Sequence, residues 1–267
     1  RSIVTGAWSK KAYKEAQHVG SVRLAGSTEG SFTRLPRAEE LKLDPQAAYV
    51  HVCTNETIHG VEMFELPALP DGVPVVADMS SHILSRPMDV SRYGLIYAGA
   101  QKNIGPAGLV IVIVREDLLG KALPTTPSVM DFAVMAENGS MLNTPPTFGI
   151  YLAGLIFKDL QRQGGLTAVE QTNAAKARLL YETIDGSSGF YLNPVDKPCR
   201  SRMNVPFTLA NPALDADFLA EAAERRLAGL KGHKSVGGMR ASIYNATSLD
   251  GVQALVDLMQ DFARRKA

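Results

Sequence analysis

Four short apolar runs in the first half of the chain constrain its fold more than any other feature. They lie at residues 49–53 (YVHVC), 73–77 (VPVVA), 95–98 (LIYA) and 109–114 (LVIVIV). The last run is β-branched at nearly every position, as expected for a strand that is covered on both faces. Buried strands separated by crossover connections predict an α/β fold, a mostly parallel sheet with helices around it.

Helix signals dominate the second half. Thr144 as an N-cap, followed by Pro145, predicts a helix that runs to about residue 163 and stops at two glycines. Thr167 and Glu170 form a capping box that predicts the start of the next helix, which ends near residue 185. One earlier helix is expected at residues 10–17.

The remaining elements predict a second, smaller unit. Strands are expected at 203–209 and 239–244, with helices at 215–229 and 248–265. Helices on one face of a small sheet form an α+β unit. Adjacent glycines between two long helices are the clearest hinge signal, so we expect a large domain at 1–164 and a small C-terminal domain at 165–267.

Composition excludes several classes of protein. The 267 residues carry a net charge of +1, so no basic surface for nucleic acid or for a membrane is predicted. The longest aliphatic run, 109–114, is far too short to span a membrane. Residues 1–20 do not resemble a signal peptide, and two cysteines suit a reducing cytosol, which predicts a cytoplasmic protein. His51 and Cys53 lack a second pair of ligands, so no metal site is expected.

The chemically most informative stretch is YAGAQKNIGPAG at residues 97–108. Lys102 follows a predicted strand and lies among small residues, which let a planar group approach the backbone. A lysine in such a place acts as a Schiff-base nucleophile once its pKa is lowered. The alternative from this stretch alone is an exposed lysine in a glycine-rich turn.

Asp78 makes the catalytic interpretation of Lys102 stronger. It follows the predicted strand at 73–77, and its distance from Lys102 leaves room for one strand–helix–strand crossover. Both side chains would then lie at the same edge of the sheet, where a carboxylate can hold a protonated pyridine nitrogen. Taken alone, an aspartate after a strand is more often a helix cap or a turn former.

Four long motifs in this order resemble the phosphoserine aminotransferase family. They are ADMSSHILSRP (77–87), YAGAQKNIGPAG (97–108), NTPPT (143–147) and GHKSVGGMRASIYNA (232–246). The resemblance covers essentially the whole chain. It implies the fold-type-I architecture of aminotransferases that use pyridoxal 5'-phosphate, and a homodimer whose active sites are shared between the subunits.

The resemblance also implies a reaction. Glutamate would give its amino group to 3-phosphohydroxypyruvate, which forms O-phosphoserine and 2-oxoglutarate in serine biosynthesis. Bacterial members also act on the related phosphohydroxythreonine intermediate of pyridoxine biosynthesis. Small molecules would therefore be the ligands, with no nucleic acid and no membrane among the partners.

Roles at the cofactor follow from the same resemblance. Lys102 matches the lysine that bonds to the cofactor and moves the Cα proton of the substrate. Asp78 matches the partner of the pyridine nitrogen. The other positions that match cofactor ligands are Trp8, stacked on the ring, Thr57 at the 3-hydroxyl side, Gln101 at the phosphate, and Asn143 and Thr144, which reach the phosphate in the other subunit.

Roles at the substrate are implied for two residues of the last motif. Arg240 matches the arginine that clamps the α-carboxylate, a task that suits its bidentate fork. His233 matches a ligand of the substrate phosphate. The next position is usually arginine in the family and is Lys234 here, which keeps the charge and loses the bidentate geometry.

Family members also carry a long segment before the position of Thr5, with a glycine-rich turn and a His-Arg pair for phosphate. The resemblance therefore describes an N-terminally truncated chain. Two alternatives to the aminotransferase stay open. One is a catalytically silent fragment that serves as a dimerising scaffold, and the other is a different class-V enzyme that keeps the cofactor and changes the reaction.

Overall fold

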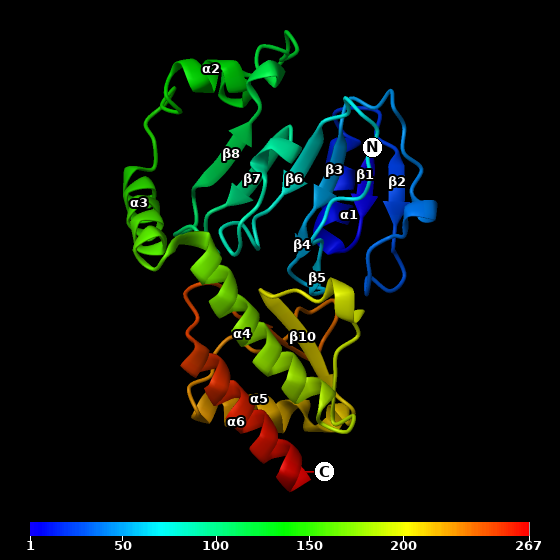
Figure 1. The fold of residues 1–267 in the computed structure, drawn as a ribbon, viewed down its shortest axis with the longest axis vertical. Helices are drawn as coiled ribbons and strands as arrows, with labels where there is room; N and C mark the ends of the chain where they lie inside the picture. Colours follow the sequence, from blue (N-terminus) through cyan, green and yellow to red (C-terminus); the bar gives the residue numbers. More distant parts are fainter. Residues whose placement is uncertain (267) are drawn as a thin grey trace.

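The computed structural model describes residues 1–266 and forms two packed layers of sheet and helix, one above the other in Figure 1. The upper part contains a six-stranded sheet in the order β2-β1-β3-β6-β7-β8. Its strands are β1 (Ser2–Val4), β2 (Leu24–Ser27), β3 (Val50–Cys53), β6 (Val75–Asp78), β7 (Leu95–Gly99) and β8 (Val110–Val114).

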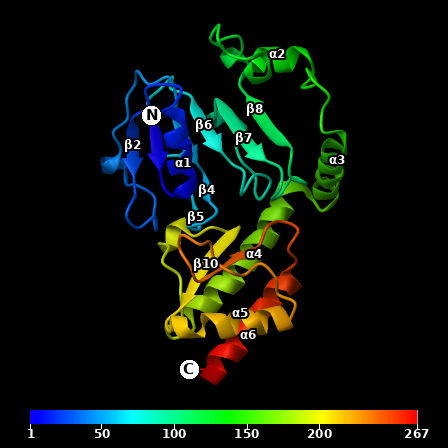
Figure 2. The ribbon, with the colours of Figure 1, turned by 180° about the vertical axis from the view of Figure 1, so that it is seen from behind.

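The first five strands of this sheet are parallel, which confirms the predicted α/β fold. Val52, Ala77 and Ala98 are fully buried at its centre, because helices and loops cover both faces there. Helix α1 (Ala7–Ala16) lies against β1 and β3, as the view from behind in Figure 2 shows. It begins three residues earlier than the sequence predicts and therefore includes Trp8.

The prediction that 109–114 is a strand covered on both faces was wrong. β8 is an edge strand, paired with β7 alone and antiparallel to it. Val110 is 61% exposed, and Val112 and Ile113 are about 40% exposed. Its β-branched residues gave it a strand conformation, but strand propensity carries no information about which faces other elements cover.

The connection between β6 and β7 also differs from the expected crossover. It contains turns and a short 3-10 segment at Val90–Arg92 in place of an α-helix. The two strands are direct neighbours, with Asp78 opposite Tyr97. The end of β6 and the loop after β7 therefore lie side by side.

Both predicted helix starts in the middle of the chain were wrong. Helix α3 (Thr147–Arg162) begins only after Pro146, because a residue that precedes proline avoids the helical conformation and Thr144 therefore stays outside. Helix α4 (Gly165–Asp185) begins directly after Gly164, whose φ of 103° lies in the left-handed region. Thr167 and Glu170 consequently lie inside α4.

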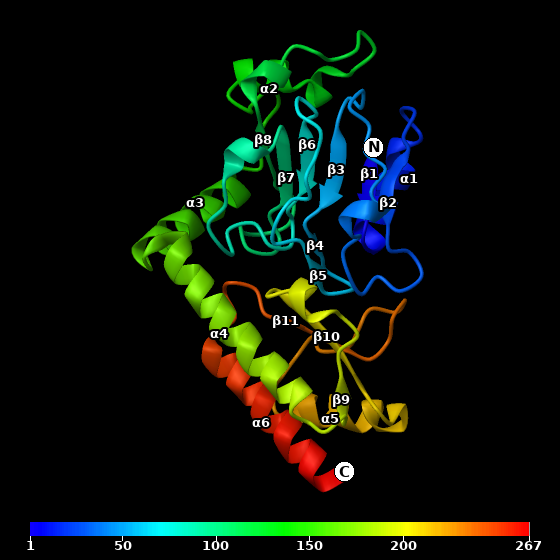
Figure 3. The same ribbon diagram turned by 45° about the vertical axis from the view of Figure 1, so that its right-hand side comes forward.

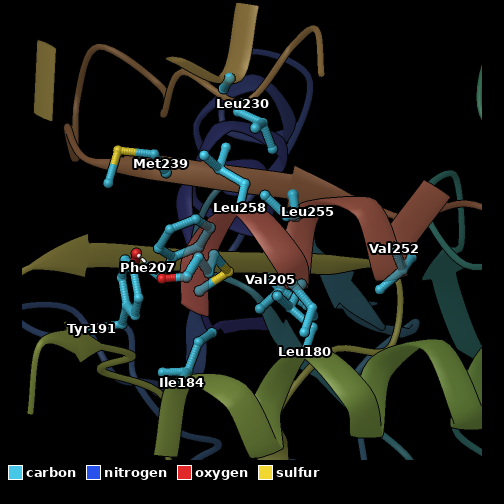
Figure 4. Close-up of a cluster of buried hydrophobic side chains, with 14 of the residues drawn as sticks. Leu180, Ile184, Tyr191, Val205, Phe207, Leu230, Met239, Val252, Leu255 and Leu258 are labelled. Atoms are coloured by element: carbon cyan, nitrogen blue, oxygen red, sulfur yellow. Dashed lines mark hydrogen bonds between the residues drawn. The ribbon is translucent and has the colours of Figure 1, made fainter. Parts of the chain in front are cut away.

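The lower part is an α+β layer. Its sheet has the order β11-β10-β9, with strands β9 (Tyr191–Leu192), β10 (Asn204–Leu209) and β11 (Met239–Ser242). Helices α4, α5 (Asp215–Glu224) and α6 (Leu249–Lys266) belong to the same layer, with α4 and α6 side by side next to the sheet in Figure 3. Figure 4 shows Phe207 and Val205 of β10 between Ile184 of α4 and Leu258 of α6.

A small hairpin connects the two layers. Strands β4 (Asn55–Glu56) and β5 (Val61–Glu62) extend from the large sheet toward the lower part, as Figure 3 shows. Asn55 Nδ2 donates to Asn204 Oδ1 of β10 at 2.9 Å. The division into domains at 1–164 and 165–267 remains our proposal, with Gly164 at the junction of α3 and α4.

One short helix was not predicted. Helix α2 (Phe132–Glu137) lies beyond β8 and is followed by the loop that leads to α3. Within residues 1–266, none of the helices is both long enough and apolar enough to cross a membrane.

Candidate active site

The carboxyl ends of the parallel strands β3 and β6 and the loop after β7 surround one cavity of about 200 Å³. Ligands collect at this edge of α/β sheets. The cavity is lined by residues from four segments of the chain, namely Trp8, Cys53, Asn55, Thr57, Asp78, Ser80, Ser81, Gln101 and Lys102. Five of the residues predicted to bind the cofactor thus share one cavity: Trp8, Thr57, Asp78, Gln101 and Lys102.

Lys102 lies in the turn after β7, and its Nζ donates to Thr57 Oγ1 at 2.9 Å. Burial lowers the pKa of Lys102 below its ordinary value, and the nearby carboxylate of Asp78 opposes that shift. A lowered pKa increases the fraction of neutral amine, which is the nucleophilic form. The alternative, an exposed lysine in a glycine-rich turn, is therefore excluded, because this amine is partly buried and hydrogen-bonded.

Asp78 ends β6, and its Oδ1 accepts a hydrogen bond from the backbone N–H of Ser80 at 2.9 Å. Behind it, the hydroxyl of Tyr97 lies 2.9 Å from Nε2 of His51. Burial lowers the pKa of His51, and the charge of Asp78 acts in the opposite direction. The carboxylate of Asp78 therefore lines the cavity at the end of β6, and a hydrogen bond from Ser80 holds it there.

Trp8 forms one wall of the cavity. It is 40% exposed although it lies in the first turn of α1, and Lys102 Nζ lies 5.9 Å from the centroid of its ring. A large aromatic side chain that stays this exposed beside an amine and a carboxylate is suited to hold a planar ligand by stacking.

Arg240 reaches this region from β11 of the lower layer. Its Nη1 is 3.4 Å from the carbonyl oxygen of Thr57, at the long end of hydrogen-bond distances. Its Nε is buried and has no hydrogen-bond partner among residues 1–266. A buried guanidinium nitrogen without a partner is suited to bind an incoming carboxylate.

His233 and Lys234 lie in the loop before β11 and do not line the cavity. His233 Nδ1 lies 2.7 Å from Ser235 Oγ and accepts from the backbone N–H of Ser235 at 3.2 Å. Because Nδ1 is an acceptor, the proton of a neutral ring belongs on Nε2, where it can meet an anion. Lys234 is exposed.

Asn143 and Thr144 are exposed in the loop between α2 and α3, away from the cavity of this chain. The structure holds a single chain, so their expected role toward another subunit stays a prediction.

Sequence reasoning missed Glu56, which is fully buried next to Thr57. It also missed Asn55 and Ser81, which hydrogen-bond to each other in the cavity wall. A charged residue in the motif NETIHG, directly beside a predicted ligand, was the available signal for Glu56. No group of three or more potential metal ligands occurs in the described part of the chain.

Comparisons with known proteins show what this chain is similar to. A curated phosphoserine aminotransferase of Aromatoleum aromaticum is 67% identical over 270 residues, which cover 98% of this chain and 74% of that protein. The enzyme of the same name from Paraburkholderia phymatum is 60% identical over 99% of this chain and 74% of its own length. The chain thus spans about three quarters of these relatives.

Solved structures give the same result. Phosphoserine aminotransferase from Bacillus circulans subsp. alkalophilus superposes with a TM-score of 0.95 at 44% identity, over all of this chain and 75% of that one. The pyridoxal-phosphate-bound enzyme from Trichomonas vaginalis gives 0.91 at 41% identity, over 97% and 74% of the two chains. The family model for class-V aminotransferases matches residues 4–255, and the chain therefore belongs to the class-V aminotransferase family.

Proposed function

We propose that this chain is a phosphoserine aminotransferase that uses pyridoxal 5'-phosphate in serine biosynthesis. It transfers the amino group of glutamate to 3-phosphohydroxypyruvate, giving O-phosphoserine and 2-oxoglutarate. The single observation that carries the proposal is one cavity that holds an amine of lowered pKa, a carboxylate and an exposed indole. The names and the high identity of the relatives support this choice of substrates.

The residues of the cavity fit this cofactor. Asp78 would hold the pyridine nitrogen in its protonated form, and Trp8 would cover one face of the ring. Lys102 would bond to the cofactor, with Thr57 beside it at the 3-hydroxyl and Gln101 at the phosphate. When bound, pyridoxal phosphate supplies an electron sink for the negative charge that develops at the substrate α-carbon.

The chain itself supplies binding and proton transfer. Lys102 Nζ would act as the general base that takes the proton from the substrate α-carbon, and it would hold that proton for the later protonation step. Burial of the amine favours this role, because a base with a lowered pKa is less fully protonated near neutral pH. Thr57 orients Nζ through its hydroxyl.

Substrate recognition would fall to the lower layer. Arg240 would bind the α-carboxylate through its Nε, which has no partner within residues 1–266, and through its Nη groups. His233 and Lys234 would bind the phosphate, which also allows phosphohydroxythreonine as a substrate in pyridoxine biosynthesis. The loop that carries them is next to β11, so both binding functions come from one segment.

The proposed assembly is a homodimer in which Asn143 and Thr144 of each subunit reach the cofactor phosphate of the other. Their exposure at a distance from this chain's own cavity is compatible with that role. The proposed location is the cytoplasm, where the free thiols of Cys53 and Cys199 stay reduced.

The first experiment adds pyridoxal phosphate to the chain, records the visible spectrum, reduces with borohydride and maps the modified peptide. We expect a pyridoxyl group on Lys102, and none on that peptide in the Lys102→Ala variant. Transamination of O-phosphoserine, with no turnover of serine, then identifies the substrate. Cofactor trapped only on other lysines would contradict the assignment, and absence of trapping would favour the silent scaffold.

A further inference from the structure

Glu56 is a completely buried carboxylate that serves the start of helix α1. Its Oε2 accepts from the backbone N–H of Trp8 at 2.9 Å, and its Oε1 accepts from the backbone N–H of Ser9 at 2.8 Å and from Ser9 Oγ at 2.5 Å. None of the ion pairs in residues 1–266 includes Glu56. The free N–H groups and the positive end of the helix dipole therefore stabilise its charge.

Gly6 makes room for this carboxylate. It is the N-cap of α1 and has no side chain with which to cap the helix. A Cβ at this position would lie 2.3 Å from Cδ and 2.5 Å from Oε2 of Glu56. The cap is thus provided by a residue about fifty positions away in the sequence, which fills the space that a local capping side chain would occupy.

The same hairpin also holds the lysine of the cavity. Thr57, the next residue after Glu56, accepts the hydrogen bond from Lys102 Nζ. Two consecutive side chains therefore fix two parts of the cavity wall, the backbone of Trp8 and the amine of Lys102. A shift of the start of α1 relative to this amine would require the hairpin to move or the Glu56 contacts to break.

We propose that Glu56 is a positioning residue that fixes the start of α1, and with it the position of Trp8, relative to Lys102, so that a planar cofactor held by Lys102 can stack on the indole. This inference rests on the proposed function for the identity of the planar group. Glu56 would not contact the cofactor and would act only through Trp8. Burial raises the pKa of Glu56, while its bonds to Ser9 and Trp8 oppose the shift.

Trp8 provides a direct readout because it is the only tryptophan of the chain. In the Glu56→Gln variant, the amide oxygen can accept from Ser9 only if the amide NH2 faces the backbone N–H of Trp8. Two hydrogen-bond donors would then face each other, so the bond to Trp8 is lost. We expect greater acrylamide quenching and lower fluorescence anisotropy of Trp8 without any added cofactor. Gly6→Ala should cause the same changes, because the new methyl group displaces the carboxylate.

Cofactor binding provides a second readout. We expect Glu56→Gln to weaken binding of pyridoxal phosphate about tenfold, as loss of one hydrogen bond to a charged group predicts. If Glu56 acts through Trp8, the loss in the double variant Glu56→Gln/Trp8→Phe should equal the loss in Trp8→Phe alone, measured by absorbance. Additive losses would contradict the proposal.

Glu62→Gln is the matched control, since Glu62 is an equally buried carboxylate of the same hairpin that faces Arg86 and Arg202. It should leave the quenching of Trp8 unchanged. Equal quenching in wild type and Glu56→Gln, or an equal rise in Glu62→Gln, would overturn the proposal. Failure to trap cofactor in wild type would contradict the proposed function instead, since the fluorescence test needs no cofactor.

Discussion

Arg240 extends from β11 of the lower layer to Thr57, which lines the cavity of the upper layer. Within residues 1–266 its Nε is buried without a partner, and its Nη1 makes a long contact to the carbonyl oxygen of Thr57. Arg240→Gln removes the charge that would bind the α-carboxylate. We expect kcat/KM for glutamate and for the phosphorylated oxo acid to fall about 30-fold or more, mainly through KM, as measured by steady-state kinetics.

The control for Arg240 is Arg225, whose guanidinium pairs with Asp261 on the surface. Arg225→Gln should leave both KM values unchanged, because a surface ion pair contributes little and lies far from the cavity. A normal KM for both substrates in Arg240→Gln would remove this residue from the carboxylate site.

Lys234 is the position at which the sequence departs from the family pattern. A lysine pairs with phosphate as a point charge, whereas arginine offers two parallel N–H donors. We expect Lys234→Arg to lower KM for the phosphorylated oxo acid by about two- to tenfold while KM for glutamate is unchanged. An equal change for both substrates would show that the loop does not contact the phosphate specifically.

The local sequence predicts some residues of the cavity and not others. Asp78 and Lys102 follow strands, and the ends of parallel strands meet at one edge, so their proximity could be inferred. Glu56 could not be assigned in this way, because its partners Trp8 and Ser9 lie far away in the sequence and no local periodicity encodes such a contact.

At the scale of elements, Lys176 attaches α4 to the segment that follows β11. Its side chain is fully buried, and Nζ donates to the carbonyl oxygens of Ile243 at 3.1 Å and of Tyr244 and Thr247 at 2.9 Å. Lys176→Met leaves all three carbonyls without this donor. We expect the free energy of unfolding at pH 7 to fall by about 2–4 kcal/mol in urea titrations.

The pH dependence of Lys176 has a definite sign. Burial lowers its pKa from 10.5 to about 8, so between these pH values the unfolded chain binds a proton that the folded chain has lost. Stability therefore rises with pH across this window. The stability difference between wild type and Lys176→Met, measured by urea titration, should grow from pH 8 to 10. A constant difference for Lys176 would contradict the assignment.

The elements also show what sequence patterns can predict. Helices α4 and α6 and strands β3, β7 and β10 were located to within a few residues, because their apolar periodicity is strong. The short strands β1, β2, β4 and β5 were missed, since two to four residues carry too little pattern. The predicted burial of β8 was wrong, because burial depends on neighbouring elements that the residues of the strand do not specify.

At the scale of the whole molecule, two apolar cores are joined by buried amides instead of a flexible linker. Asn173 of α4 donates to the carbonyl of Ser85 at 3.0 Å and to Asn245 Oδ1 at 2.8 Å. Asn245 in turn donates to the carbonyl of Leu84, and its backbone N–H donates to Asn103, which follows Lys102. The lower layer is thereby connected to the loop that carries Lys102.

This amide network predicts that the two layers unfold together. We expect one calorimetric transition for wild type. Asn173→Ala removes the donor from the Ser85 carbonyl and from Asn245 Oδ1, which should cost about 1–3 kcal/mol and split the transition in two. The exposed Asn138→Ala should keep a single transition near the wild-type temperature, since Asn138 donates only to its own helix. A single, unshifted transition in Asn173→Ala would show that apolar contacts alone hold the layers together.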